Sequence, residues 1–263
     1  MSYPIPEIFA PKGCIIDTHA HYESEQYDGL RDQIFASFDD LGVSAVINCG
    51  CNIESSKKNI ELAKKYDCCY AAVGFHPEDI TDKSLNFGAL ENLLKCEKVL
   101  AVGEIGLDYY WNKENREKQI EAFIFQIELA KKYDLPIIVH DRDAHCDTLE
   151  ILKKYKPKGV VHCFSGSLEM AREIVKLGMY IGVGGVVTFK NARKLVEVVE
   201  DIPMEKILLE TDGPYLAPEP FRGKLNNSFL ISLVAQKISE IKKIPINEIY
   251  RITKENAISL FKF

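Results

Sequence analysis

Short apolar runs alternate along the chain with longer segments in which apolar residues recur at helical spacing. Most of the apolar runs are continuous, which is typical of parallel strands that are buried on both faces. They predict a first strand within 15–21 and further strands at 43–49, 69–75, 99–105, 137–140, 160–164, 180–184 and 207–211. The amphipathic segments predict helices at 28–41, 55–66, 87–95, 115–133, 143–154, 168–177, 192–199, 229–242 and 247–261.

This alternation of eight strands with helices predicts an α/β fold, a single-domain (β/α)8 TIM barrel spanning residues 1–263. The competing fold is an open, doubly wound sheet. That fold would favour a Gly-x-Gly-x-x-Gly turn after an early strand, and the sequence has none there. Residues 217–228 form one long irregular segment, and such loops in compact domains are often functional.

The composition is that of an ordinary globular protein, with 46% hydrophobic and 27% charged residues. A net charge of −6 argues against a broad basic surface for duplex DNA but leaves room for a local basic pocket. The sequence shows neither an apolar run of about 18 residues nor a signal-like N-terminus, so we expect no membrane span and no secretion. None of the eight cysteines forms a Cys-x-x-Cys pair, so we expect free thiols and a cytoplasmic protein.

Candidate metal-binding and catalytic residues lie at the C-terminal ends of the predicted strands. Side chains alternate along a strand, so His19 and His21 point to the same side. Five of the six histidines lie at such ends, together with Glu104 and Asp212. These histidines are His19, His21, His76, His140 and His162. In a (β/α)8 barrel the C-terminal strand ends form one mouth, where active sites lie.

Six of these residues make a chemically sensible set of metal ligands: His19, His21, Glu104, His140, His162 and Asp212. Four imidazoles and two carboxylates exceed what one tetrahedral ion needs, and they suit two divalent ions. Glu104, from a central strand, is the natural bridge between them. Asp212 can ligate and also take the proton of a water that a metal activates. The ligand types leave Mg, Mn and Zn open.

Three cationic residues near these strand ends suit an anionic substrate. Arg142 follows the fifth predicted strand, and Arg222 and Lys224 lie in the long segment after the eighth. Guanidinium and ammonium groups at such positions can bind the non-bridging oxygens of a phosphate. We therefore expect these three residues to contact substrate.

Aromatic residues follow the fourth predicted strand, and each has a structural alternative. Tyr109, Tyr110 and Trp111 are candidates for stacking on a nucleobase, and packing at the barrel rim is the alternative. Tyr109 is the strongest substrate-binding candidate of the three. His76, before Pro77, is a further substrate-binding candidate, with a hydrogen-bonded structural role as its alternative.

Short motifs in these regions resemble those of the TatD family of metal-dependent deoxyribonucleases, a branch of the amidohydrolase-like TIM barrels. The matching motifs are Asp17-Thr18-His19-Ala20-His21, Gly74-Phe75-His76-Pro77, Gly103-Glu104-Ile105-Gly106-Leu107-Asp108-Tyr109, His140-Asp141-Arg142-Asp143-Ala144, His162-Cys163-Phe164-Ser165-Gly166, Glu210-Thr211-Asp212 with Pro214-Tyr215-Leu216, Pro220-x-Arg222-Gly223-Lys224 and Thr253-x-x-Asn256-Ala257. They occur in order from residue 17 to residue 257, so the resemblance covers nearly the whole chain.

The resemblance implies metal ligation by the six residues above, with Asp212 positioned to activate water. It also implies hydrolysis of phosphodiester bonds, typically the removal of nucleotides from the 3′ end of DNA. Single-stranded DNA or nucleic-acid ends are then the expected substrate, and we expect a monomer. The chain departs from the family pattern at Leu225-Asn226-Asn227-Ser228, where the family usually has Arg-Asn-Glu-Pro. That departure leaves the anchoring of the loop and the substrate preference open.

Two other functions remain alternatives. One is a two-metal hydrolase of small amide, ester or phosphoester substrates on the same barrel. Such barrels commonly bridge their metals with a carboxylated Lys at the end of the fourth strand, where this chain has Glu104, and the first Lys after it is Lys113. The other is a silent binding protein that has kept the barrel. A protein without catalytic activity would have no chemical reason to keep six metal ligands.

Overall fold

The computed structural model describes residues 3–81, 85–111 and 113–263. Its eight strands pair in parallel in sequence order. The strands are β1 (Ile15–Ala20), β2 (Val43–Cys49), β3 (Cys69–Val73), β4 (Val99–Asp108), β5 (Ile137–Arg142), β6 (Gly159–Val161), β7 (Tyr180–Val183) and β8 (Ile207–Leu209). A parallel bridge between Ala20 and Gly213 joins the β8 side to β1, which nearly closes the sheet into a barrel. The predicted single-domain (β/α)8 barrel is therefore confirmed.

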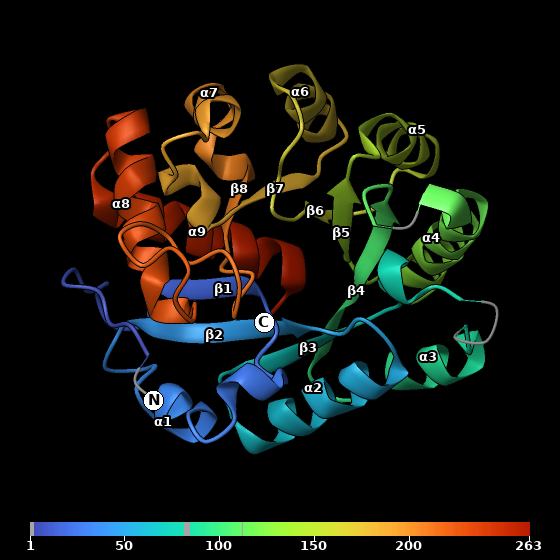
Figure 1. The fold of residues 1–263 in the computed structure, drawn as a ribbon, viewed down its shortest axis with the longest axis horizontal. Coiled ribbons are helices and arrows are strands. Elements are labelled where there is room, and N and C mark those ends of the chain that lie inside the picture. Colours follow the sequence, from blue (N-terminus) through green and yellow to red (C-terminus); the bar gives the residue numbers. More distant parts are fainter. Residues whose placement is uncertain (1–2, 82–84, 112) are drawn as a thin grey trace.

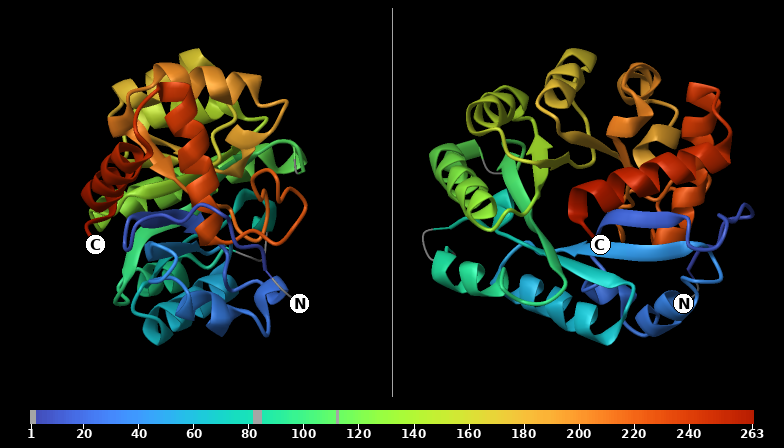
Figure 2. Two further views of the ribbon diagram at one scale, coloured as in Figure 1. Left: turned by 90° about the vertical axis from the view of Figure 1, so that its left-hand side faces the viewer. Right: turned by 180° about the vertical axis from the view of Figure 1, so that it is seen from behind.

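Helices surround the sheet and follow the strands in turn (Figures 1 and 2). They are α1 (Arg31–Ala36), α2 (Ile53–Lys65), α3 (Phe87–Leu93), α4 (Arg116–Lys132), α5 (His145–Tyr155), α6 (Leu168–Lys176), α7 (Arg193–Asp201), α8 (Ile231–Lys242) and α9 (Ile246–Phe261). Short 3-10 helices lie at Glu25–Tyr27, Pro77–Asp79, Lys113–Asn115, Gly185–Thr188, Met204–Lys206 and Ser228–Leu230. Polar side chains start several elements: Asn52 caps α2 together with Ser55, and Ser167 caps α6.

The barrel has two apolar layers. Between the sheet and its helices lies the larger cluster, which includes Phe123, Leu152 and Val198. Inside the barrel, small residues such as Ala72 and Ala101 leave room for side chains from the opposite wall. Helix α9 adds its own apolar residues to this inner cluster. Its contributions are Ala257, Leu260 and Phe261.

The inner cluster forms the floor of the barrel, because it gathers residues from the first halves of the strands, such as Ile16 and Ala45. Asn256 fixes α9 there, since its side-chain amide donates to the carbonyl oxygens of Met204 (2.7 Å) and Ile207 (2.8 Å). With one end closed by α9, the C-terminal strand ends form the open mouth. Polar chemistry is thereby confined to one end of the barrel.

Most predicted elements differ from the structure by one to three residues at an end, and two differences are instructive. The predicted strand 99–105 continues to Asp108, because pairing with β5 extends through Asp108 and Arg142. The predicted helix 28–41 shortens to α1, and Ser37 ends it with a backbone N–H shared among three carbonyl oxygens. The segment after β8 is irregular up to Asn227, as the sequence predicts. These differences leave the order of elements unchanged.

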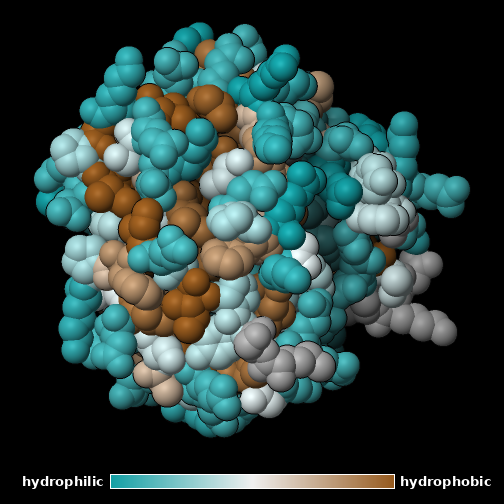
Figure 3. Space-filling model, turned by 60° about the vertical axis from the view of Figure 1, so that its left-hand side comes forward, coloured by the Kyte–Doolittle hydropathy of each residue, from teal (hydrophilic) through white to brown (hydrophobic). Residues whose placement is uncertain are grey.

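Surface and cysteine properties agree with the composition. One face of the molecule shows apolar groups interspersed with hydrophilic side chains (Figure 3). Among the residues that the structure describes, no helix has the length and apolar character needed to cross a membrane. All eight cysteines are free thiols. The prediction of free thiols is therefore confirmed.

Candidate active site

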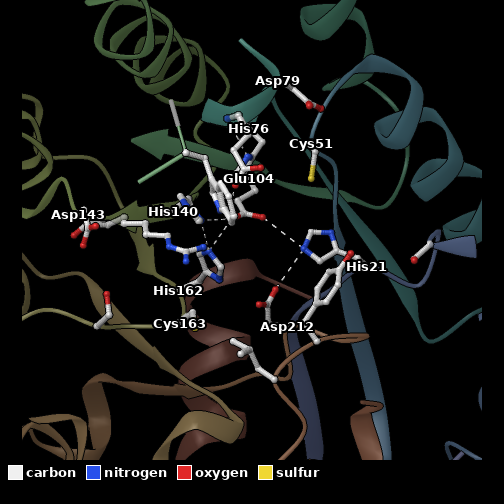
Figure 4. Close-up of a pocket in the computed structure, with 18 of the residues that line it drawn as sticks. His21, Cys51, His76, Asp79, Glu104, His140, Asp143, His162, Cys163 and Asp212 are labelled. Atoms are coloured by element: carbon white, nitrogen blue, oxygen red, sulfur yellow. Dashed lines mark hydrogen bonds and ion pairs between the residues drawn. The ribbon is translucent and has the colours of Figure 1, made fainter. Parts of the chain in front are cut away.

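Six side chains from five places in the barrel meet at the mouth. His19 and His21 come from the end of β1, Glu104 from β4 and His140 from β5. His162 follows β6 directly, and Asp212 follows β8 by three residues. Figure 4 shows the side chains of His21, Glu104, His140, His162 and Asp212 directed toward one another. The structure therefore brings together the six residues that the sequence singles out, here called the cage.

Glu104 lies at the centre of the cage. Its Oε1 atom is 2.7 Å from His162 Nε2 and 2.8 Å from His140 Nδ1. Its Oε2 atom is 3.3 Å from His19 Nε2 and 3.6 Å from His21 Nε2. The two oxygens of one carboxylate thus face two different pairs of imidazoles. This is the arrangement that a bridging carboxylate requires.

Asp212 completes the side of the cage that His19 and His21 form. Its Oδ1 atom is 3.6 Å from His19 Nε2 and 3.5 Å from His21 Nε2. The backbone of Asp212 is left-handed (φ 58°), a conformation that Asp adopts more readily than most residues. The side chain of Asp212 is 20% exposed, whereas that of Glu104 is 4% exposed. Of the two carboxylates, Asp212 is the one that solvent reaches.

Hydrogen bonds outside the cage orient two of the rings. His21 Nδ1 donates to the carbonyl oxygen of Cys49 (2.9 Å), which leaves the lone pair of Nε2 facing the cage. His140 Nε2 donates to Asp108 Oδ2 (3.0 Å), which leaves the lone pair of Nδ1 facing Glu104. Outer partners of this kind fix the tautomer of a metal-binding histidine. Both rings are thus prepared as ligands.

The donor set fits metal ions better than it fits internal hydrogen bonding. His19 Nε2 and His21 Nε2 are 3.0 Å apart, and His140 Nδ1 and His162 Nε2 are 3.3 Å apart. Neutral imidazoles held this way direct lone pairs at one another, which a cation between them would relieve. Groups of potential ligand atoms within 4.8 Å of one another include His19, His21 and Glu104, and also His19, His162 and Asp212.

Electrostatics set the charge states of the cage. Burial alone would raise the pKa of Glu104, but the surrounding imidazoles, His162 foremost, hold it well below its usual range. Burial also opposes ionisation of Asp212, yet the surrounding imidazoles, His21 foremost, lower its pKa. Burial lowers the pKa of His19 to about 4, so its imidazole is neutral. Despite burial, the nearby carboxylates raise the pKa values of His21, His140 and His162, and metal binding displaces any proton that these rings hold.

His76, which follows β3, lies next to the six cage residues and contacts them as a hydrogen-bond donor. Its Nδ1 atom accepts from the backbone N–H of Glu78 (3.2 Å), so the ring proton of the neutral form lies on Nε2. Nε2 is 3.3 Å from Glu104 Oε1. The structure thus places His76 against the central carboxylate, and contact with substrate stays a prediction.

The other substrate-binding candidates lie at different distances from the mouth. Arg142 lines a cavity of about 1060 Å³ above the cage. Tyr109 is not among the lining residues; its hydroxyl donates to Asp147 and its ring lies beside Arg116. Arg222 and Lys224 are exposed on the loop after β8 and are also outside the lining. Substrate contact by Tyr109, Arg222 and Lys224 stays a prediction.

The segment that departs from the family pattern is firmly anchored. Asn226 donates to the carbonyl oxygens of Thr211 (2.8 Å) and Tyr215 (2.6 Å). Asn227 donates to the carbonyl oxygen of Pro4 (2.9 Å). Ser228 donates to Asp17 (2.7 Å) from a fully buried position. The loop therefore has its own buried polar anchors in place of the charged pair.

Sequence reasoning missed the roles of two carboxylates. Asp108 orients His140 through Oδ2 and accepts from the backbone N–H groups of Tyr110 and Trp111 through Oδ1 (2.9 Å each). Glu210 accepts from the backbone N–H of Cys163, and its Oε1 is 4.0 Å from His162 Nδ1. Both lie in motifs, but only the fold shows which ring each one faces.

Cys163 directly follows the cage residue His162 in the chain and lines the cavity at the mouth. Burial, with nearby Asp212 and Glu210, raises the pKa of its thiol well above the ordinary value. A neutral thiol is a poor nucleophile. Cys163 therefore shapes the wall of the cavity without supplying a nucleophile.

Comparison with known proteins agrees with this site. A family model described as TatD related DNase matches residues 16–262. An uncharacterized metal-dependent hydrolase of Bacillus subtilis, YabD, is 43% identical, over 94% of this chain and 99% of its own length. Another from Escherichia coli, YcfH, is 34% identical, over 94% and 95%.

Solved structures show the same relationship. The crystal structure of YjjV, a TatD homologue from Escherichia coli, superposes with a TM-score of 0.89 at 34% identity, over 95% of this chain and 99% of that one. A TatD family hydrolase from Entamoeba histolytica superposes with a TM-score of 0.84 at 26% identity, over 97% and 99%. The range that the family model matches, 16–262, contains all six cage positions. The chain belongs to the TatD family and is a metal-dependent hydrolase.

Proposed function

We propose that this hydrolase cleaves phosphodiester bonds in DNA and removes nucleotides from the 3′ end of single strands. The observation that carries the proposal is one open mouth that combines a six-ligand cage with the guanidinium of Arg142. Phosphodiester hydrolysis needs these two features together, an activated water and a cation for the non-bridging oxygens. The family description as a DNase supports the same substrate class.

The cage divides into two sides that would each hold one divalent ion, Mg, Mn or Zn. His19, His21 and Asp212 form one side, and His140 and His162 form the other. Glu104 faces both through its two oxygens. Divalent ions bound there polarise a phosphoryl oxygen and lower the pKa of the attacking water.

Asp212 is the proton acceptor in this proposal. Its side chain is 20% exposed at the mouth, whereas that of Glu104, which also lines the cavity, is only 4% exposed. The attacking water transfers a proton to the Asp212 carboxylate as its oxygen bonds to phosphorus. The phosphorus–oxygen bond to the remaining strand then breaks, and the departing oxygen takes up a proton from solvent. Glu104 keeps the two sides of the cage together throughout.

Arg142 positions the phosphate, because it is exposed and lines the cavity. Arg222 and Lys224 lie on the loop after β8, where they suit phosphates further along the strand. The net charge of −6 argues against a broad basic surface, and Arg142 is the one Lys or Arg among the described residues that line the cavity. A few local cations favour a strand end over a long duplex.

The test is an assay of metal-reconstituted protein on single-stranded DNA, duplex DNA, RNA and a simple phosphodiester, with each nucleic acid labelled at one end. We expect 5′-labelled single strands to shorten progressively and 3′-labelled strands to release a labelled mononucleotide at once. Asp212→Asn protein with matched metal content serves as the control. Cleavage only at internal phosphodiester bonds would contradict the proposed exonuclease activity. Hydrolysis of the simple phosphodiester alone would contradict the proposed deoxyribonuclease activity.

A further inference from the structure

Two exposed aromatic side chains lie on opposite rims of the mouth. Trp111 follows β4 and is 63% exposed, and Tyr215 follows β8 and is 55% exposed. Both line the cavity above the cage. β4 and β8 are four places apart in an eight-stranded order, so their ends lie across the barrel from each other. The cage lies between these two rings.

The loop that carries Trp111 is fixed by the site itself. Asp108 Oδ1 accepts from the backbone N–H groups of Tyr110 and Trp111, and Asp108 Oδ2 accepts from His140. The guanidinium of Arg142 lies 4.1 Å from the ring centroid of Tyr110 and 5.5 Å from that of Trp111. One buried carboxylate thus ties this aromatic rim to a cage histidine. The indole is held out to solvent by a constrained loop.

The opposite rim is tied to the cage in a similar way. The backbone N–H of Tyr215 donates to the carbonyl oxygen of Asp212 (2.9 Å). The Tyr215 carbonyl oxygen in turn accepts from the side chain of Asn226, which is completely buried. The backbone of Tyr215 therefore keeps a set position relative to the proton acceptor, and its ring projects from that position as an exposed side chain.

We infer that Trp111 and Tyr215 form a nucleobase clamp, in which each ring stacks on the base of one of the two nucleotides that flank the scissile phosphate. This clamp rests on the proposed function and specifies the class of substrate that the enzyme prefers. Large exposed rings on constrained backbone are suited to stacking, and every base offers a flat face. Bases in a duplex stack on their neighbours and are not free to do this. The clamp therefore favours unpaired strands of at least two nucleotides, without regard to sequence.

The test compares a thymine dinucleotide with an abasic dinucleotide that has the same phosphodiester. For each protein we take the ratio of kcat/KM for the two substrates. We expect Trp111→Ala and Tyr215→Ala each to lower this ratio about tenfold, through a higher KM for the thymine dinucleotide. Trp111→Phe should restore most of the ratio. Phe125→Ala, which removes an exposed ring on α4 outside the cavity lining, should leave it unchanged.

A wild-type ratio in both alanine variants would overturn the clamp and leave the proposed function intact. If the wild-type protein hydrolyses neither the dinucleotides nor end-labelled single strands, the proposed function fails, and fluorescence then decides the clamp separately. Trp111 is the one tryptophan in the chain, so its emission reports directly on stacking. Saturable quenching of the metal-loaded protein by the thymine dinucleotide, and not by the abasic one, would support the clamp. Equal responses to both dinucleotides would overturn it.

Discussion

Two buried polar clusters lie next to each other at the end of β1, and they differ in how their atoms are paired. The first, here called the anchor cluster, consists of Asp17, Thr211, Ser228 and Tyr22. The second is the cage, which begins only two residues after Asp17. Both clusters include residues of β1 and of the segment after β8. Neighbouring parts of the same segments therefore serve two purposes.

In the anchor cluster the Asp17 carboxylate is fully satisfied. Oδ2 accepts from Thr211 Oγ1 and from Ser228 Oγ (2.7 Å each), and Oδ1 accepts from two backbone N–H groups. Tyr22 completes the cluster through Ser228. Burial raises the pKa of Asp17 to about 6 even though these bonds oppose the shift. A fully paired buried cluster stabilises the fold and offers nothing to a ligand.

In the cage the opposite holds, since ring nitrogens face each other and a shared carboxylate. Among the described residues, His19 Nδ1 and His162 Nδ1 have no hydrogen-bond partner either. Convergent lone pairs without enough protons to share are costly unless a cation joins them. The comparison teaches that pairing, more than burial or residue type, separates a structural polar cluster from a ligand-binding one.

The largest expected effect is on activity, from Asp212→Asn. Removing the proton acceptor should lower kcat by about 100- to 10,000-fold, measured on an end-labelled single strand. The unfolding midpoint in EDTA should stay near that of the wild type, because Asp212 is partly exposed and contributes to the cage alone. Turnover near the wild-type level would contradict the role of Asp212 as the base.

The next effect is on stability, from Asp17→Ala in the anchor cluster. It leaves Ser228, Thr211 and two backbone N–H groups without their buried acceptor, so the free energy of unfolding should fall by about 3 kcal/mol or more. Urea unfolding in EDTA measures this separately from metal binding. Asp40→Ala, at an exposed position, is the control and should stay within about 0.5 kcal/mol. An equally small change for Asp17→Ala would remove the contrast.

Metal binding should stabilise the protein through the cage alone. At a free Mn²⁺ concentration 100 times the Kd, the native state gains about 2.7 kcal/mol, seen as a higher Tm than in EDTA. His19→Ala should lose most of this gain, whereas Ser228→Ala should keep it. A Tm that is identical with Mn²⁺ and with EDTA would show that the convergent lone pairs do not bind metal.

The smallest effect is expected for Ser228→Ala. This change removes one buried hydroxyl that donates to Asp17 and contacts Tyr22, so the free energy of unfolding should fall by about 1 kcal/mol. Activity should stay close to that of the wild type, since the hydroxyl does not reach the cavity. A large loss of kcat without a loss of stability would show that the two clusters are coupled.

The sequence predicts the barrel and the cage well, because both depend on local patterns. Buried runs mark the strands, and a histidine or carboxylate at the ends of six of the eight strands marks the mouth. It does not predict the anchor cluster, since Ser228 and Asp17 are 211 positions apart and only the closed barrel brings them together. It also misses the link from Asp108 to His140, which depends on the register of β4 against β5.

The dependence on tertiary structure also explains why the sequence does not show which aromatic residue after β4 faces the cavity. From the sequence, Tyr109, Tyr110 and Trp111 are three similar candidates in one run. The fold turns Tyr109 toward Asp147 and leaves Trp111 at the cavity, because the Asp108 carboxylate bends the chain after β4. Which neighbour faces the mouth is set by a turn, and the spacing of residues does not reveal it.

The most direct test of the central claim is the metal content of the protein after reconstitution with Mn²⁺ or Zn²⁺ and removal of excess ions. The two sides of the cage, joined by Glu104, predict two equivalents per chain. Elemental analysis of the wild type measures this number without reference to any substrate. Well below one equivalent would contradict the account, because the convergent lone pairs of the cage would then have no ion to bind.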